Sequence, residues 1–105
     1  MINYGLENRV AIITGANNPW GIGATTALAF ALEVAQYGIT VNCVAPGPTQ
    51  TGWIDAEFEK VVVPLIPMGK LIQPEDIAET ILFLASEQAR MLTGQVIKVS
   101  GGHAL

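Results

Sequence analysis

The sequence has few of the residues that several kinds of function require. It contains one cysteine, one histidine and five lysine or arginine residues among 105, against nine acidic residues, and its net charge is −4. A lone cysteine excludes an internal disulfide, and His103, the single histidine, has no clustered ligands that would make a metal site. So few basic residues leave no electrostatic surface for nucleic acid or an anionic membrane. We therefore expect no metal, no nucleic-acid partner and no membrane partner.

Long apolar runs are also missing. Half of the residues are hydrophobic, but Thr, Glu or Pro interrupts every apolar stretch well short of the ~20 residues that span a bilayer. The first eight residues lack the basic and then apolar pattern of an export signal. We expect a single cytoplasmic domain over residues 1–105, with a modest core that holds Cys43 as an inert thiol.

A strand, a glycine-rich turn and a helix open the chain. The β-branched run Val10–Thr14 predicts a parallel strand that is buried on both faces. The spacing of Leu28, Ala31, Leu32 and Ala35 predicts a helix over Ala24–Gln36, and Gly38 supplies its C-terminal stop.

The turn between this strand and this helix is typical of dinucleotide-binding proteins. Gly15 would permit the tight turn, Gly21 would let the backbone approach a pyrophosphate, and Gly23 would allow close packing of helix on strand. Ile22 lies with them at the helix N-terminus, whose dipole favours negative charge. The alternative is an ordinary strand-to-helix turn that needs glycine only for its φ angles. Trp20 would either cover the turn or stack on an adenine ring.

The rest of the chain predicts more elements of the same kind. We expect strands at Ile39–Val44 and Val96–Ser100, a helix at Pro74–Ser86, and a loop or short helix over Thr51–Leu71. The buried stripe of the second helix should consist of Ile77, Ile81, Leu84 and Ala85.

These elements define an α/β fold class. We expect a reduced Rossmann-like domain with about three parallel strands, ordered first, middle and last, and with right-handed crossovers. The helices would then lie mainly on one face of the sheet. The other face would expose an apolar patch of several hundred Å², which something must cover.

Several later segments closely resemble the short-chain dehydrogenase/reductase family. They follow the family's order, and with the glycine turn they cover nearly the whole chain. The segments are Tyr37–Thr51, Pro67–Lys70, Gln73–Ala78, Ile81–Ser86, Leu92–Gln95 and Val99–Gly102. The resemblance implies NAD or NADP as cofactor and redox chemistry on alcohols or carbonyls. It also implies that Pro46, Gly47, Thr49 and Thr51 lie near the nicotinamide amide.

The same resemblance shows what is missing. The first helix passes directly into Leu32–Gly38, which resembles the end of the family's helix after the catalytic tyrosine. The second strand with its ribose-binding acid, the catalytic Ser and the Tyr-x-x-x-Lys pair are all absent. Neither Tyr4 nor Tyr37 has a lysine four positions later, so no catalytic residue is assigned. Without the ribose-binding acid, the sequence does not distinguish NAD from NADP.

Smaller departures concern three positions. Five residues separate Gly15 from Gly21 where the common family pattern has three, which could reposition the phosphate. Ser100 stands where the family usually has Asp, and Lys70 where it often has Arg.

Three interpretations remain open. The chain is a family homologue that keeps part of the cofactor site, binds cofactor weakly or not at all, and has no activity of its own. Alternatively, it is an interaction module that pairs with itself or with full-length subunits through Pro74–Ser86 and the last strand. The third possibility is a deletion product or an engineered minimal form without an independent role.

The segment between the middle strand and the second helix carries a charged face and two aromatic residues. Asp55, Glu57, Glu59 and Lys60 should form a solvated helix face. Trp53 and Phe58 should pack against the chain itself, because the opposite wall of the family's substrate cleft is absent.

Overall fold

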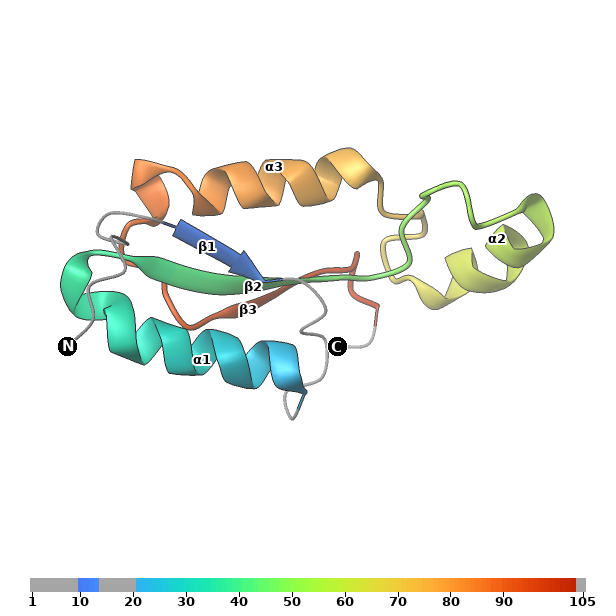
Figure 1. Cartoon of the computed structure of the whole chain (residues 1–105). Coiled ribbons are helices and arrows are strands. Elements are labelled where there is room, and N and C mark those ends of the chain that lie inside the picture. The colour runs from blue at the N-terminus through green and yellow to red at the C-terminus, as the bar shows by residue number, and fades with distance from the viewer. Residues whose placement is uncertain (1–9, 14–20, 104–105) are drawn as a thin grey trace.

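The computed structural model describes residues 10–13 and 21–103. Its strands are β1 (Val10–Ile13), β2 (Thr40–Pro46) and β3 (Val96–Val99), and its α-helices are α1 (Ile22–Val34), α2 (Ala56–Val62) and α3 (Pro74–Leu84) (Figure 1). Short 3-10 turns occupy Ala35–Tyr37, Val63–Leu65 and Glu87–Ala89. The predicted order of elements is confirmed, with boundaries that shift by one or two residues. Gly38 ends the first helical segment in the left-handed conformation, with a φ of 72°.

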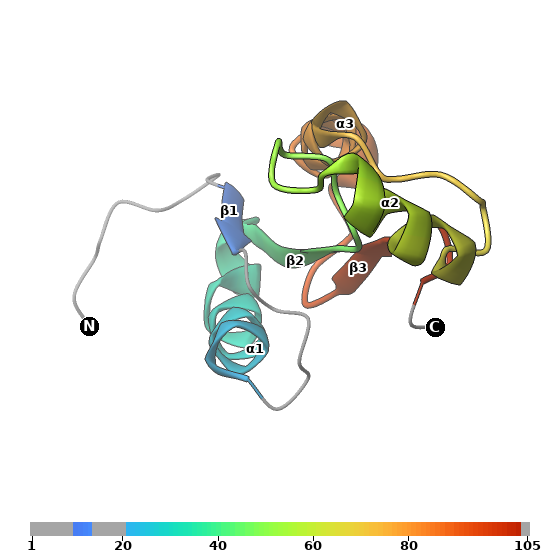
Figure 2. The ribbon, with the colours of Figure 1, turned by 90° about the vertical axis from the view of Figure 1, so that its right-hand side faces the viewer.

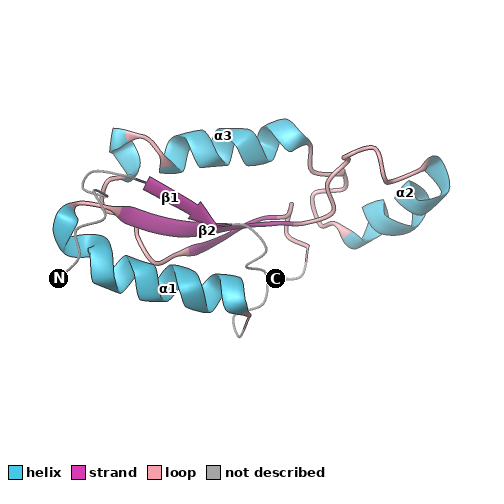
Figure 3. Cartoon of the chain, in the orientation of Figure 1, coloured by secondary structure: helices cyan, strands magenta, loops and turns pink. Residues whose placement is uncertain are grey.

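The three strands form one parallel sheet in the order β1-β2-β3 (Figure 3). In register, Val10 lies opposite Thr40, and Cys43 lies opposite Val96. The expected α/β class with about three parallel strands is confirmed. In full-length family members the strands that correspond to β1 and β2 are not neighbours, so their direct pairing here is a new one. It agrees with the general tendency of consecutive strands to be neighbours, here joined by a single crossover through α1.

The structure contradicts the expectations that the helices lie mainly on one face and that both crossovers are right-handed. α1 covers one face of the sheet and α3 the other, as the two perpendicular views show (Figures 1 and 2). Since the chain moves in one direction across the sheet, the two crossovers have opposite hands. The crossover through α1 is right-handed and the crossover through α3 is left-handed. The usual preference for the right hand applies to a strand that feeds directly into its helix. Here 27 residues, including α2, separate β2 from α3.

α1 packs on β2 through small side chains. Ala24, Ala27 and Ala31 are buried, and they meet a cluster formed by Ile39, Val41 and Cys43. The predicted stripe is therefore correct for Ala31 but wrong for Leu28 and Leu32, which are 54% and 76% exposed, and for Ala35, which is exposed. Alanine lets the helix backbone approach the sheet closely, and a wider leucine at these positions would not fit between them.

A second cluster joins α2 and the segment before α3 to the sheet. Val62, Ile66, Leu71 and Ile72 are buried there, and Ile77 and Val99 pack against them. Along α3, Leu84 is buried, Ile77 and Ile81 are half-buried, and Ala85 is exposed, so the predicted stripe is correct except at Ala85.

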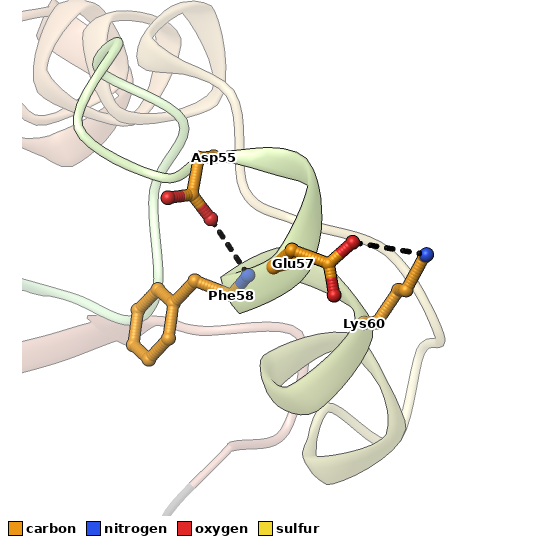
Figure 4. A network of polar contacts seen from close by, with 4 residues as sticks. All are labelled: Asp55, Glu57, Phe58 and Lys60. Atoms are coloured by element: carbon orange, nitrogen blue, oxygen red, sulfur yellow. Dashed lines mark hydrogen bonds and ion pairs between the residues drawn. The ribbon is translucent and has the colours of Figure 1, made fainter.

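The α2 segment projects beyond the sheet (Figures 1 and 2). The Asp55 carboxylate caps its first turn by accepting the backbone N–H of Phe58 at 2.8 Å, and Lys60 Nζ lies 3.3 Å from Glu57 Oε1 (Figure 4). The predicted solvated face is confirmed, because these charged side chains are exposed. The prediction for Trp53 and Phe58 was wrong, since they are 90% and 52% exposed. α2 is only seven residues long, so it reaches the second cluster with one side only.

Candidate functional site

The candidate site lies at the carboxyl edge of the sheet. α1 begins there on one face of the sheet, and after β2 the chain leaves toward α2 and then α3, which lies on the other face (Figure 1). Ligands of open α/β sheets bind outside the carboxyl ends of strands, where neighbouring connections diverge in this way. Gly15 and Trp20, which the sequence places in the glycine-rich segment, lie outside the described residues. Gly21 is the first described residue at this edge.

The start of α1 has the features of an anion-binding helix end. Gly21 is extended (φ −79°, ψ 164°), and its carbonyl accepts the Thr25 N–H at 3.1 Å. Within the described residues no side chain caps this end, and its first turn holds no acidic residue. Gly23 is half-buried and Ile22 is 88% exposed. No described residue therefore occupies the first N–H groups of the helix, and these groups and the positive dipole end suit a phosphate.

The other two α-helices differ from α1 in this respect. Asp55 caps α2, and in α3 the Asp76 carboxylate accepts the Gln73 N–H at 2.8 Å. Both helices also carry acidic residues in their first turns. A further anion would be repelled at either of those ends, so α1 is the helix suited to a phosphate.

Gly47 lies directly after β2 and packs tightly on the end of β3. Its N–H donates to the Val99 carbonyl at 3.0 Å. A Cβ on Gly47 would lie 2.8 Å from both Cα and Cβ of Ser100, and 3.3 Å from Cδ1 of Ile72. Glycine is thus needed here for a close approach between backbones. The sequence suggested only a role beside the nicotinamide, because the partner of Gly47 lies 53 positions away.

The loop after Gly47 is held in place by further hydrogen bonds. Ile72 pairs with Thr49 as a parallel bridge, receiving the Gln50 N–H at 2.9 Å and donating its own N–H to Pro48 at 3.0 Å. The Thr49 hydroxyl donates to the Gly47 carbonyl at 2.8 Å. Its oxygen keeps free lone pairs, which could accept an N–H from a carboxamide.

The remaining predicted positions are less constrained. Pro46 and Thr51 are exposed at the same edge. The structure therefore brings Gly21, Ile22 and Gly23 to the sheet edge that also carries Pro46, Gly47, Thr49 and Thr51. These residues could hold the phosphate and the carboxamide of a nicotinamide nucleotide.

The described residues hold few titratable groups that could do chemistry at this edge. Burial raises the pKa of the Cys43 thiol above its ordinary value of 9.0, which keeps it protonated and unreactive, as expected for an inert core thiol. Tyr37 lies at the far end of α1, before β2 begins, and therefore at the opposite edge of the sheet. Within residues 10–13 and 21–103 no three His, Cys, Asp or Glu side chains are grouped so that they could hold a metal.

The fold and this edge define a Rossmann-like α/β domain of the nucleotide-binding class. Residues 23–104 match the family model described as enoyl-(acyl carrier protein) reductase. The chain belongs to the short-chain dehydrogenase/reductase family, as its motifs suggested.

Several known proteins are similar to the chain. The 3-oxoacyl-[acyl-carrier-protein] reductase FabG of Rickettsia felis is 48% identical over 84 residues, which cover 77% of this chain and 34% of FabG. The structure of a 3-oxoacyl-[acyl-carrier protein] reductase of Brucella melitensis with bound NAD superposes with a TM-score of 0.78 and 27% identity, covering 96% of this chain and 44% of the other. The angucycline C-6 ketoreductase LanV with bound NADP gives a TM-score of 0.73 and 30% identity, with 90% and 42% covered.

Two facts follow from these comparisons. Structural neighbours of the chain bind NAD or NADP, which is the cofactor type that the motifs implied. The chain spans between one third and one half of the length of these relatives.

Among its described helices, none is both long enough and apolar enough to cross a bilayer.

Proposed function

We propose that the chain is a homologue of NAD(P)-dependent oxidoreductases that retains a partial nicotinamide nucleotide site and transfers no hydride on its own. The observation that carries this proposal is that the uncapped start of α1 and the Gly47–Thr51 loop both lie at the carboxyl end of the sheet. The first would hold a phosphate, and the second would hold the carboxamide.

The partial site should bind only weakly. The chain has no counterpart of the family's second strand, which carries the ribose-binding acid on the adenosine side. In addition, β1 pairs directly with β2, so one strand spacing of about 4.8 Å separates the two strands whose ends carry the anchors. A whole dinucleotide would therefore keep its phosphate contact and lose most contacts of its adenosine half.

Calorimetry with NADH and NADPH tests this site. We expect a dissociation constant of about 1 mM or weaker, which corresponds to roughly −4 kcal/mol. Gly21→Val should abolish the binding that remains, because its side chain would block the approach to the helix end. Ala29→Val is the matched control, since it adds the same side chain on an exposed position of the same helix. Micromolar affinity would contradict the weak site, and unchanged binding in Gly21→Val would contradict its location.

The proposed lack of activity rests on the missing proton donor. In relatives a tyrosine exchanges a proton with the substrate, and a lysine one helical turn away lowers the pKa of that tyrosine; this chain has no such pair. Losing positioned acid–base catalysis costs about 10²–10⁴ in rate. We expect no change in NADH or NADPH absorbance with ketones or secondary alcohols. Turnover that persists on purification and that Tyr37→Phe or Tyr4→Phe lowers would overturn this proposal.

A second candidate function is an interaction module. The β3 strand is hydrogen-bonded to β2 alone among the described strands, Val96 on β3 is 44% exposed, and Leu82 on α3 is 69% exposed. An open strand edge with apolar side chains near it favours pairing with another chain, either a second copy or a full-length family subunit. Sedimentation of the purified chain tests self-pairing.

A cytoplasmic location, which the sequence leads us to expect, stays a prediction.

A further inference from the structure

A groove runs between α2 and α3. It consists of two adjoining hollows of about 570 and 350 Å³, which share Lys70, Leu71 and Asp76 as lining residues. The smaller hollow begins beside Glu59 on α2, and the larger one continues along α3 to Phe83. We call this feature the α2–α3 groove. It adjoins the nucleotide edge described above, because Ile72 and Val99 of its lining are hydrogen-bonded to the loop after β2.

The lining of the groove combines apolar side chains with polar ones. Leu71 and Ile72 are buried in it, while Val63 and Val99 are half-buried. Phe83 is 49% exposed at the end of the groove that lies along α3. Met68 also lines the larger hollow and is 68% exposed, and exposed apolar side chains of this kind are a feature of protein-binding grooves, because burying them gives most of the binding energy.

The charged side chains along the groove are mainly acidic. Glu59, Asp76 and Glu79 line it, and Lys70 is its one lysine. The Asp76 carboxylate already accepts the Gln73 N–H. Lys60, which directly follows Glu59 in the sequence, pairs with Glu57 and not with Glu59. The side-chain carboxylates of Glu59 and Glu79 have no ion-pair or hydrogen-bond partner among the described residues. Residues 53–83 hold six acidic and two basic residues, a balance of −4 that equals the net charge of the whole chain.

The negative charge of the groove favours a cationic partner over a second copy of the chain. A second copy of the chain that placed its own α2–α3 region there would add acidic residues to acidic residues, and such like-charge contacts are costly. A cationic and amphipathic segment would instead neutralise Glu59 and Glu79 while it buried the apolar lining. α3 has 11 residues and is about 16 Å long, which corresponds to three turns of a bound helix.

We propose that the α2–α3 groove binds a cationic amphipathic helix of a partner protein. Apolar side chains of that helix, three or four positions apart, would contact Met68 and Phe83, which are the exposed apolar side chains of the groove. Its lysine or arginine residues would face Glu59 and Glu79. The side chains that would contact this helix are not among those of the proposed nucleotide site, so peptide binding and cofactor binding can be measured separately.

Fluorescence anisotropy with three synthetic helical peptides tests the proposal. The first carries leucine on one face and lysine on the other, the second replaces the lysines with glutamate, and the third replaces the leucines with alanine. We expect the chain to bind the leucine–lysine peptide and to bind the other two at least about tenfold more weakly, because both the charge and the apolar contacts contribute.

Charge variants of the chain locate the binding. Glu59→Gln with Glu79→Gln should weaken the leucine–lysine peptide about tenfold, since each variant removes one charge pair. Glu33→Gln with Glu87→Gln removes the same net charge from exposed positions outside the groove, and should change the affinity less than twofold. All four positions are exposed, so the variants should fold like the original chain, which circular dichroism checks.

Three results would overturn the proposal. Equal binding of all three peptides would show unspecific apolar adhesion, and an equal loss in both double variants would show a general charge effect. A stable dimer that the leucine–lysine peptide does not dissociate, and that Phe83→Ser weakens, would show that a second copy occupies the groove.

Discussion

Replacing Gly47 with alanine tests the packing that positions the loop at the nucleotide edge. The added Cβ would lie 2.8 Å from Cα and Cβ of Ser100, closer than such atoms approach one another. The side chain of Ile72, 3.3 Å away, can rotate. The Cα of Ser100 cannot move without shifting the end of β3, whose Val99 carbonyl accepts the Gly47 N–H.

The expected effect is a moderate loss of stability. Overpacking of this kind costs about 1–3 kcal/mol. The loss of glycine's freedom in the unfolded chain offsets about 0.4–1 kcal/mol of it. We therefore expect the free energy of unfolding to fall by roughly 1–2 kcal/mol and the melting temperature by roughly 4–16 °C. Thermal and urea unfolding followed by circular dichroism measure both quantities.

A double-mutant cycle separates this clash from a general effect of alanine. Ser100→Gly removes the Cβ that Gly47→Ala meets and leaves the Cα, so the pair should recover part of the loss, about 0.5–1 kcal/mol. Gly52→Ala is the matched control, because Gly52 has a φ of 93° and no atom within 4 Å of an added Cβ. It should destabilise through its backbone conformation and show no coupling to Ser100→Gly. Equal coupling in both cycles, or none in either, would refute the reasoning.

Three further results are expected. Asp55→Ala should lower the free energy of unfolding by about 1 kcal/mol through the lost helix cap, whereas Glu57→Ala, which breaks only an exposed ion pair, should cost less than about 0.5 kcal/mol; equal losses would contradict the capping role. Because burial raises the pKa of Cys43, the neutral thiol stabilises the fold fully below its ordinary value of 9.0, and this stability should decline above pH 9. Between pH 8 and pH 10, urea unfolding should show a larger loss of unfolding free energy for the original chain than for Cys43→Ala. An equal loss in both would contradict this role of the thiol. The isolated chain should sediment as an oligomer, and a compact monomer that binds no hydrophobic dye would be evidence against the open β3 edge as a pairing surface.

Some features of the chain depend on neighbouring residues, and the sequence determined them. Apolar periodicity and the positions of Pro74 and Gly38 specify where the strands and helices occur, because hydrogen bonding and helix capping act within a few residues. The motifs near Gly47 and Gly101 identified the family without a structure. The burial of Cys43 followed from its place in an apolar strand.

The tertiary structure decided the features that join distant parts of the chain. The pairing of β1 with β2, the placement of α1 and α3 on opposite faces, and the packing of Gly47 on Ser100 each depend on residues far apart in sequence. α1 shows the same limit: its leucines suggested the buried stripe, yet the close approach to β2 selected its alanines. Side-chain character indicates which residues favour burial, but only the shape of the facing surface determines which of them are buried.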